Sequence, residues 1–352
     1  MKRTRPKFLK HIVSQTITRN LANTGGIATD LQWFGPATLT LNGANTYTGT
    51  TTINAGTMVR KSTTASTAHV ISSGAVLEIN VASGTRNEPT NTMSGTGTLR
   101  KTGAGTLQWT STAGTFSFSA GALIDVQAGQ FTGGSFANEN WTANQSDLNV
   151  ASGATFDGVE ANIRVNAITG LGTIKSGYPG AGYANFTFGV NNGSGTFAGV
   201  LADQVVAGNY MKIGTGTQTL SGTNTNTGTT TVNVGTLAVS GSSTSSPHTV
   251  ASAATISGGS AITGSIGALT FSALASKLSV NAITASSASK LTCTTLTAAS
   301  GFTINVGAIT TVGVYDILVS TSGTPTPTLG TNATTITVIF AWVGQILKMT
   351  LV

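Results

Sequence analysis

The chain has 352 residues, of which 45 are Gly and only 8% are charged, so it is a poor helix former and an ordinary former of strands and turns. A hydrophobic content of 39% and a mean hydropathy of +0.19 argue against disorder. The single cysteine, Cys293, excludes an intrachain disulfide and a thiolate metal cluster, and no apolar run is long enough for a membrane-spanning helix.

The net charge of +7 is concentrated near the N-terminus. Six of the 17 basic residues lie in the first 19 positions, which contain no acidic residue, whereas the rest of the chain has 11 basic and 10 acidic residues. Residues 1–34 are therefore predicted to form a basic attachment arm, with a solubilising tail as the alternative. The nearly neutral remainder argues against nucleic-acid binding. The predicted partner-binding residues of the arm are Lys2, Arg3, Arg5, Lys7, Phe8, Leu9, Lys10, Trp33 and Phe34.

The basic start matches a secretory signal only in part. Lys10, His11 and Gln15 interrupt the apolar segment that such a signal requires, and no small-residue cleavage site follows it. We therefore expect that the chain is not secreted by the general route.

Residues 35–310 are predicted to form a solenoid of stacked strands, because a strand-and-turn unit is repeated in the sequence. Thr38–Thr57 recurs as Thr217–Thr236, with 14 identical residues in 20. Such internal repetition is typical of stacked solenoids. The alternation of apolar and polar residues predicts that Leu41 and Leu220 face inward. Gly43 and Gly222 are expected at equivalent turns, with a positive φ that other residues adopt only at a cost.

Residues 111–200 are less repetitive and richer in aromatic residues than the remainder of the solenoid region. Within them, residues 129–148 read as a loop that leaves the solenoid, and such loops commonly carry binding. Phe131, Phe136 and Trp141 are therefore predicted as a possible surface-binding loop. Residues 311–352 differ again, with a run of alternating apolar residues that ends at Trp342, and they are predicted to form a small β cap or oligomerisation unit.

Four segments resemble the autotransporter-associated β-strand repeats. The matching sequences are Leu39–Gly49, Ser94–Leu107 and Asn192–Val200, within the segments 35–59, 93–108 and 188–200, and the segment 214–237 repeats the first. Such repeats occur in the passenger domains of bacterial secreted adhesins and in bacteriophage fibre-like proteins. The resemblance implies an all-β, right-handed parallel β-helix and no catalytic residues. Complete autotransporters of this family would also carry a cleavable signal and a C-terminal membrane domain, neither of which we expect here.

Residues with catalytic or metal-binding potential are few and scattered. Asp157 and Glu160 are the closest pair in the sequence among ten carboxylates. We interpret them as solvated turn residues, with the catalytic pair of a glycosidase as the less favoured alternative. His11, His69 and His248 are far apart in the sequence, which argues against a metal site or a Ser-His-Asp triad. We expect no catalytic residue, no metal and no cofactor.

These observations favour a non-enzymatic structural adhesion protein. The first hypothesis is a homotrimeric bacteriophage fibre or spike subunit at the virion surface. Its arm would bind a capsid or tail protein, and its solenoid would bind a host cell-surface glycan or protein. The alternative is a bacterial adhesin of the autotransporter-passenger type, located at the outer surface or outside the cell. A second alternative is a polysaccharide-degrading spike that uses Asp157 and Glu160.

Overall fold

The computed structural model describes residues 7–9, 13–88, 92–109, 114–134, 140–179, 185–259, 263–284, 287–307, 312–332 and 338–352. All regular structure within these ranges is β-strand, without any helix. The described residues accordingly contain no helix that is long and apolar enough to cross a membrane. Contacts divide the chain into two compact units, Met1–Tyr183 and Ala184–Val352.

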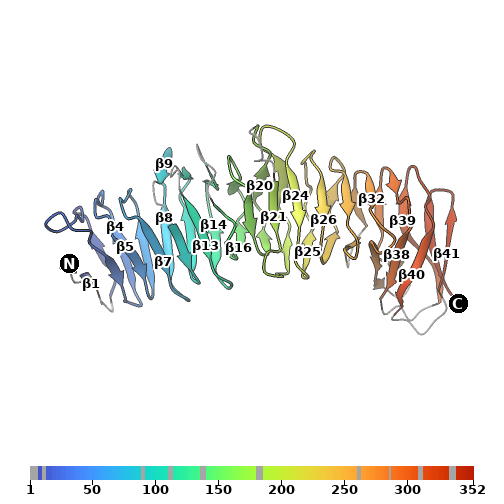
Figure 1. Cartoon of the computed structure of the whole chain (residues 1–352), viewed down its shortest axis with the longest axis horizontal. Helices are drawn as coiled ribbons and strands as arrows, with labels where there is room; N and C mark the ends of the chain where they lie inside the picture. The colour runs from blue at the N-terminus through green and yellow to red at the C-terminus, as the bar shows by residue number, and fades with distance from the viewer. Residues whose placement is uncertain are drawn as a thin grey trace. The chain divides into compact units, whose positions relative to one another are not determined.

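The first unit is built from stacked parallel strands (Figure 1). One sheet contains, in order, β1 (Lys7–Leu9), β3 (Leu31–Trp33), β5 (Thr50–Ile53), β7 (Ala68–Ile71), β10 (Thr92–Gly95) and β13 (Thr115–Phe118). A second contains β2 (Gln15–Ile17), β4 (Thr38–Leu41), β6 (Thr57–Arg60), β8 (Val76–Asn80), β11 (Thr98–Thr102), β14 (Leu123–Val126), β16 (Asp147–Val150) and β19 (Ile168–Gly170). A third contains β9 (Thr85–Glu88), β12 (Thr106–Trp109), β15 (Gln130–Thr132), β17 (Thr155–Asp157) and β20 (Thr173–Ser176), and β18 (Ile163–Val165) also belongs to this unit.

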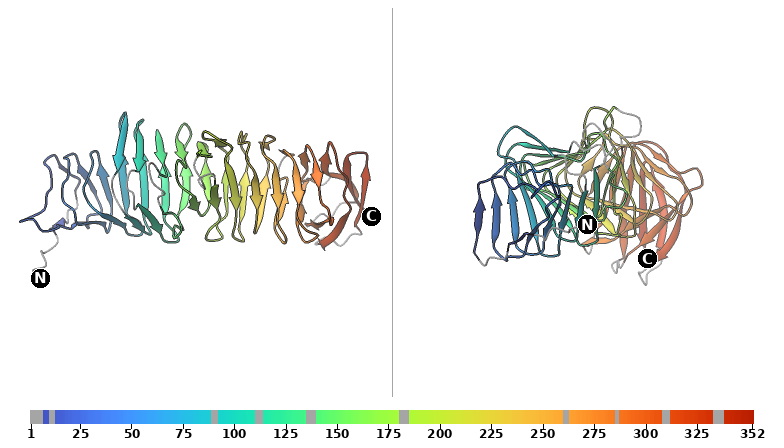
Figure 2. Two further views of the ribbon diagram at one scale, coloured as in Figure 1. Left: turned by 45° about the horizontal axis from the view of Figure 1, so that its top comes forward. Right: turned by 60° about the vertical axis from the view of Figure 1, so that its left-hand side comes forward.

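The second unit repeats this construction (Figure 2). One sheet contains β21 (Asn185–Phe188), β24 (Asn209–Lys212), β26 (Thr230–Val232), β29 (His248–Val250), β32 (Leu269–Phe271) and β37 (Leu296–Thr297). The next contains β22 (Gly195–Phe197), β25 (Thr217–Leu220), β27 (Thr236–Val239), β30 (Thr255–Ser257), β33 (Lys277–Val280), β38 (Phe302–Val306) and β40 (Pro327–Asn332). A further sheet contains β28 (Ser242–Ser243), β31 (Gly264–Ile266), β36 (Leu291–Cys293), β39 (Gly313–Ser320), β42 (Ile346–Leu351) and β41 (Val338–Val343), and the remaining strands are β23 (Val200–Asp203), β34 (Ala282–Thr284) and β35 (Ser287–Ala288).

The strand pairing confirms the prediction of an all-β parallel solenoid. β4, β6 and β8 pair in parallel, with Thr38 opposite Thr57 and Thr57 opposite Val76. Each step from one of these residues to the next is therefore one turn of the chain around the core. Alternating burial places the apolar residues inside, and Leu41 and Leu220 are each 1% exposed, as predicted.

Strand pairing extends beyond the predicted solenoid region at both ends. β1 pairs with β3 and β2 pairs with β4, so residues of the predicted arm already take part in the parallel sheets. Near the other end, β42 pairs antiparallel with both β39 and β41. The division at residues 34 and 310 stays a prediction, as does the right-handed sense of the coil.

The repeat detected in the sequence is a repeat of structure over a longer stretch. We call residues 38–102 the first copy and residues 217–281 the second copy. The alignment that places Thr38 on Thr217 also relates the β4–β6–β8–β11 pairing to that of β25–β27–β30–β33, residue for residue. Buried asparagines also correspond, because Asn45 accepts a hydrogen bond from the backbone of Leu21 at 3.0 Å and Asn224 accepts one from Leu201 at 2.9 Å.

The two glycines predicted at equivalent turns are required for a different reason than expected. Neither Gly43 nor Gly222 is among the residues with positive φ, so that part of the prediction is wrong. A Cβ atom on Gly43 would lie 2.4 Å from the Arg19 carbonyl oxygen, and one on Gly222 would lie 1.9 Å from the Gly199 carbonyl oxygen. Close approach of the neighbouring coil, and not backbone conformation, therefore requires glycine at both positions.

Candidate functional site

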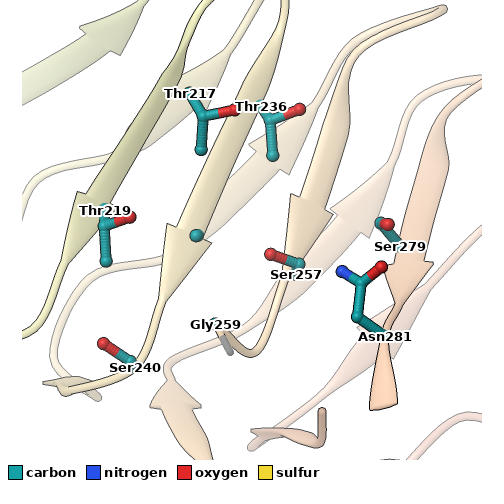
Figure 3. Close-up of a pocket in the computed structure, with 9 residues that line it drawn as sticks. Thr217, Thr219, Thr236, Ser240, Ser257, Gly259, Ser279 and Asn281 are labelled. Carbon is teal, nitrogen blue, oxygen red and sulfur yellow. The ribbon is translucent and has the colours of Figure 1, made fainter. Parts of the chain in front are cut away.

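A hollow lined by hydroxyl groups lies on the outer face of the second copy, across β25, β27, β30 and β33 (Figure 3). Its volume of about 380 Å³ is in the range of small-ligand sites. We call it the hydroxyl groove. It is lined by Thr217, Thr219, Thr236, Ala238, Ser240, Ser257, Gly259, Ser279 and Asn281.

The groove follows from the register of four parallel strands. Alternation along each strand sends every second side chain outward, and the parallel register stacks the outward residues in columns. One column runs through Thr219, Ala238, Ser257 and Ser279. Ala238 and Ser257 are the short side chains in its middle, and they are only 6% and 5% exposed because the neighbouring side chains rise around them. The floor of the groove is therefore made by small residues.

The hydroxyl groups of the groove are free to bind a ligand. Within the part of the chain that the structure describes, the side-chain oxygens of its threonines and serines accept or donate no hydrogen bond to the protein. These residues are Thr217, Thr219, Thr236, Ser240, Ser257 and Ser279. Each hydroxyl group both donates and accepts, so the surface offers a row of neutral hydrogen-bonding groups.

The corresponding surface of the first copy is filled by larger side chains, and its charged groups bind neighbouring polar residues. Val59, Glu78 and Arg100 take the places of Ala238, Ser257 and Ser279. Their charged groups have partners, since Glu78 accepts a 2.7 Å hydrogen bond from Thr102, and Arg100 Nε lies 2.9 Å from an oxygen of Asp125. The two copies thus share one backbone register and differ in the chemistry of their outer faces.

The interior of the first unit holds a buried group of charged residues that no sequence pattern predicted. Arg60 Nη2 lies 3.0 Å and 2.7 Å from the two carboxylate oxygens of Glu88, and both side chains are fully buried. Arg60 Nη1 also donates to Nε2 of His69 at 3.2 Å, because a guanidinium has no acceptor. Burial, reinforced by Arg60 and Arg86, holds the pKa of His69 well below its usual value, so the ring is neutral.

Two buried lysines bind backbone carbonyl groups at the corners of the solenoid. Lys101 Nζ donates to the carbonyl oxygens of Thr102, Gly103 and Ala128 at 2.7–3.0 Å. Lys212 Nζ binds three carbonyl oxygens in the same way, at 2.7, 2.7 and 3.2 Å. Burial lowers the pKa of each lysine to about 8. Both lysines are therefore structural cations at neutral pH, and their ammonium groups are fully engaged.

The two carboxylates considered for hydrolysis lie at a turn of the first unit. Asp157 is 4% exposed, and it lies opposite Lys175 in the pairing of β17 with β20. Burial raises the pKa of Asp157 to about 6. Glu160 has a φ of 50° and interacts with Tyr178. Asp157 is thus enclosed by the protein, and the described residues contain no group of His, Cys, Asp and Glu side chains that could hold a metal ion.

The structure places only part of the predicted arm. Lys2, Arg3, Arg5 and Lys10 lie outside the described residues, and only the backbone is described for Lys7, Phe8 and Leu9 in β1. Trp33 is fully buried and its indole nitrogen donates to the Ala37 carbonyl oxygen at 3.3 Å, while Phe34 is half-buried. Trp33 is therefore part of the core, and its prediction as a partner-binding residue finds no support.

The predicted aromatic loop is likewise placed in the core where it is described. Phe131 belongs to β15 and is fully buried, and Trp141 is 1% exposed. Trp141 stacks on Phe116 with ring centroids 4.0 Å apart, and its indole nitrogen donates to the Gly133 carbonyl oxygen at 2.9 Å. Phe136 lies outside the described residues. The prediction that Phe131 and Trp141 belong to a surface-binding loop is therefore corrected, because their rings fill the interior of the solenoid.

Comparisons with known proteins agree with the repeat architecture. Residues 34–59 and 212–239 match the family described as Passenger-associated-transport-repeat. The chain is 34% identical over 148 residues to a protein named Adhesin BmaC autotransporter from Brucella suis biovar 1 (strain 1330). That match covers 41% of this chain but only 4% of the Brucella protein. No solved structure matches the chain.

The comparisons favour a bacterial adhesin over the virion fibre that was the first hypothesis from the sequence, since nothing in them supports a phage origin. The first matched segment contains β4, β5 and all but the last residue of β6, and the second contains β25, β26 and β27, where the repeat was found. The predicted resemblance to the autotransporter-associated β-strand repeat proteins is therefore confirmed by the two segments of this chain that match passenger-associated-transport repeats and by the similarity to the Brucella protein.

Proposed function

We propose that this chain is a binding segment of a bacterial adhesin of the autotransporter-passenger type, exposed at the cell surface or released from it. The observation that carries the proposal is that each passenger-associated-transport repeat overlaps the beginning of one of the two structural copies of the solenoid. The 34% identity to a protein named as an adhesin autotransporter supports it.

The physical character of the solenoid suits binding better than catalysis. Arg60 and Glu88 in its interior are paired with each other, and Lys101 is bound to backbone carbonyl groups. The burial of Asp157 gives no support to hydrolysis, because a general acid must reach its substrate. We therefore propose a non-enzymatic role, in which the outer faces of the coils contact another surface.

Oligomerisation and attachment through the arm remain predictions. A homotrimer would be detected by sedimentation of the purified chain, which would show a mass three times 35.3 kDa. A strictly monomeric chain over a wide range of concentrations would contradict that prediction.

Adhesion of coated beads tests the proposed function. Fluorescent beads carrying the purified chain are incubated with animal cells and counted by flow cytometry, and beads carrying the urea-unfolded chain serve as the control. We expect saturable attachment that soluble folded chain inhibits. Attachment no greater than that of the control, on every cell type and on bacterial cells, would overturn the proposal. A gene position among capsid and tail genes would also speak against it.

A further inference from the structure

We infer that the hydroxyl groove of the second copy binds a neutral, linear polysaccharide, and this inference rests on the proposed function of the chain in adhesion. The nine residues that line the groove contain six hydroxyl groups and one amide, and none of them is charged. Lys277 lies next to the groove, in the column of Thr217 and Thr236, but does not line it. A charged ligand would therefore leave its hydration shell without gaining an ion pair from any lining residue. A neutral ligand rich in hydroxyl groups would exchange hydrogen bonds to water for equivalent bonds to the protein.

The spacing of the groups suits a repeating ligand. Neighbouring parallel strands lie about 4.8 Å apart, so equivalent hydroxyl groups recur at that distance across the sheet. Thr217 and Thr236 are such a pair, and Ser257 and Ser279 are another. Figure 3 shows these side chains on the same side of the sheet. A linear chain of pyranose rings laid across the strands would meet one set of donors and acceptors per ring.

The floor of the groove adds an apolar contact. The methyl group of Ala238 lies between Thr219 and Ser257 in the same column, and the threonines contribute further methyl groups. Sugar rings carry C–H groups on their faces and hydroxyl groups at their edges, so a surface that mixes methyl and hydroxyl groups matches them. No aromatic ring lines the groove, and the affinity of one site is expected to be weak, in the millimolar range.

The first copy provides an internal comparison for this inference. It has the same register of strands, but Glu78 and Arg100 occupy the column and are bound to Thr102 and Asp125. The second copy has serines in place of Glu78 and Arg100 and has kept the outward threonines Thr217, Thr219 and Thr236. Its one added charge is Lys277, in place of Thr98, which does not line the groove. A surface opened by small residues in one copy alone points to a role beyond folding, because both copies fold alike.

The test uses neutral linear oligosaccharides as probes. Cellohexaose, maltohexaose and mannohexaose are titrated into the purified full chain, with hexagalacturonate as the acidic counterpart. Binding is followed by saturation-transfer NMR and by calorimetry. We expect at least one neutral hexasaccharide to bind and the acidic one to bind at least tenfold more weakly. Binding of hexagalacturonate alone, or no binding of any probe at 10 mM or so, would overturn the inference.

Exchange of residues between the copies supplies a matched pair of variants. The triple substitution Ala238→Val, Ser257→Glu and Ser279→Arg places the first copy's side chains in the groove, and its folding is checked by circular dichroism. The control carries Lys61→Ser and leaves the groove intact. We expect the triple variant to lose at least tenfold in affinity and the control to bind as the wild type does.

The bead assay separates this inference from the proposed function. If beads coated with the triple variant attach to cells as well as wild-type beads, the groove is not the contact site, although the chain is still an adhesin. If wild-type beads fail to attach, the proposed function itself fails, whatever the oligosaccharides do. Unchanged binding of the neutral hexasaccharide by the folded triple variant would also overturn the inference.

Discussion

Acidification is expected to destabilise the second unit through His248. This side chain is completely buried at the inward position of β29, and its Nδ1 lies 2.9 Å from the carbonyl oxygen of Ser246. Since a carbonyl oxygen only accepts, Nδ1 must carry the hydrogen, and Nε2 has no partner among the described residues. Burial lowers the pKa of His248 to about 4, and the bond to Ser246 opposes that shift only in part.

The size of the effect follows from the two protonation states. The unfolded chain takes up a proton on this histidine near pH 6.5, whereas the folded chain resists it until about pH 4. Below pH 6.5 the unfolded state therefore binds more protons, and the free energy of unfolding falls as the pH falls. A difference of about 2.5 units at about 1.36 kcal/mol each gives a total loss of about 3.4 kcal/mol, of which about 2 kcal/mol is reached at pH 5.

Urea unfolding at pH 7.5 and pH 5 measures this loss, with His248→Asn as the variant. The Asn amide still offers an N–H donor to Ser246 and has no titratable group. We expect the wild type to lose about 2 kcal/mol more than the variant between the two pH values. His69 also lowers the stability on acidification, whereas Asp157 raises it, because burial raises the pKa of Asp157 to about 6. Both residues are present in the wild type and in the variant, so their effects drop out of the difference between the two proteins. Equal losses in the two proteins would refute the reasoning.

Three substitutions test the packing of the coils by their effect on the urea midpoint. Gly222→Ala places a Cβ against a backbone oxygen 1.9 Å away, and we expect a loss of about 2–3 kcal/mol. Gly74→Ala has free space around its Cβ and is the comparison, expected to cost about 1 kcal/mol through its φ of 74° alone; an equal cost would argue against the close approach. Glu88→Gln leaves two buried arginines without a counter-charge and is expected to cost about 3–5 kcal/mol, so a change below 1 kcal/mol or so would contradict the buried ion pair. Lys101→Met removes the donor to three carbonyl groups, for a loss of about 1–3 kcal/mol, whereas the exposed Lys61→Met is expected to change little.

The fold was predictable because its signals are local and repeated. Alternating apolar residues, as at Leu39 and Leu41, indicate which face of a strand is buried, and the repeated turns indicate stacking. The role of Gly43 was not predictable, because a glycine that avoids a clash and a glycine with positive φ look the same in a sequence. The burial of Arg60 and Glu88 was also hidden, since charged residues are usually exposed.

Predicting the hydroxyl groove would have required the register of strands on successive coils, and a sequence shows that register only indirectly. One signal was present. Extending the alignment of Thr38 with Thr217 beyond the repeated segment places Ala238 on Val59 and Ser257 on Glu78, which shows small residues replacing large ones. The prediction of a surface-binding aromatic loop failed because Phe131 and Trp141 lie in a polar stretch of the sequence but pack inside the first unit.

The most direct test of the account is the attachment of beads to cells, compared between the wild type and the triple variant Ala238→Val, Ser257→Glu and Ser279→Arg at equal coating density. We expect that wild-type beads attach, that the neutral hexasaccharide bound by the chain inhibits them, and that beads with the folded triple variant lose most of their attachment. Equal attachment of both kinds of bead, unaffected by any neutral oligosaccharide, would contradict it.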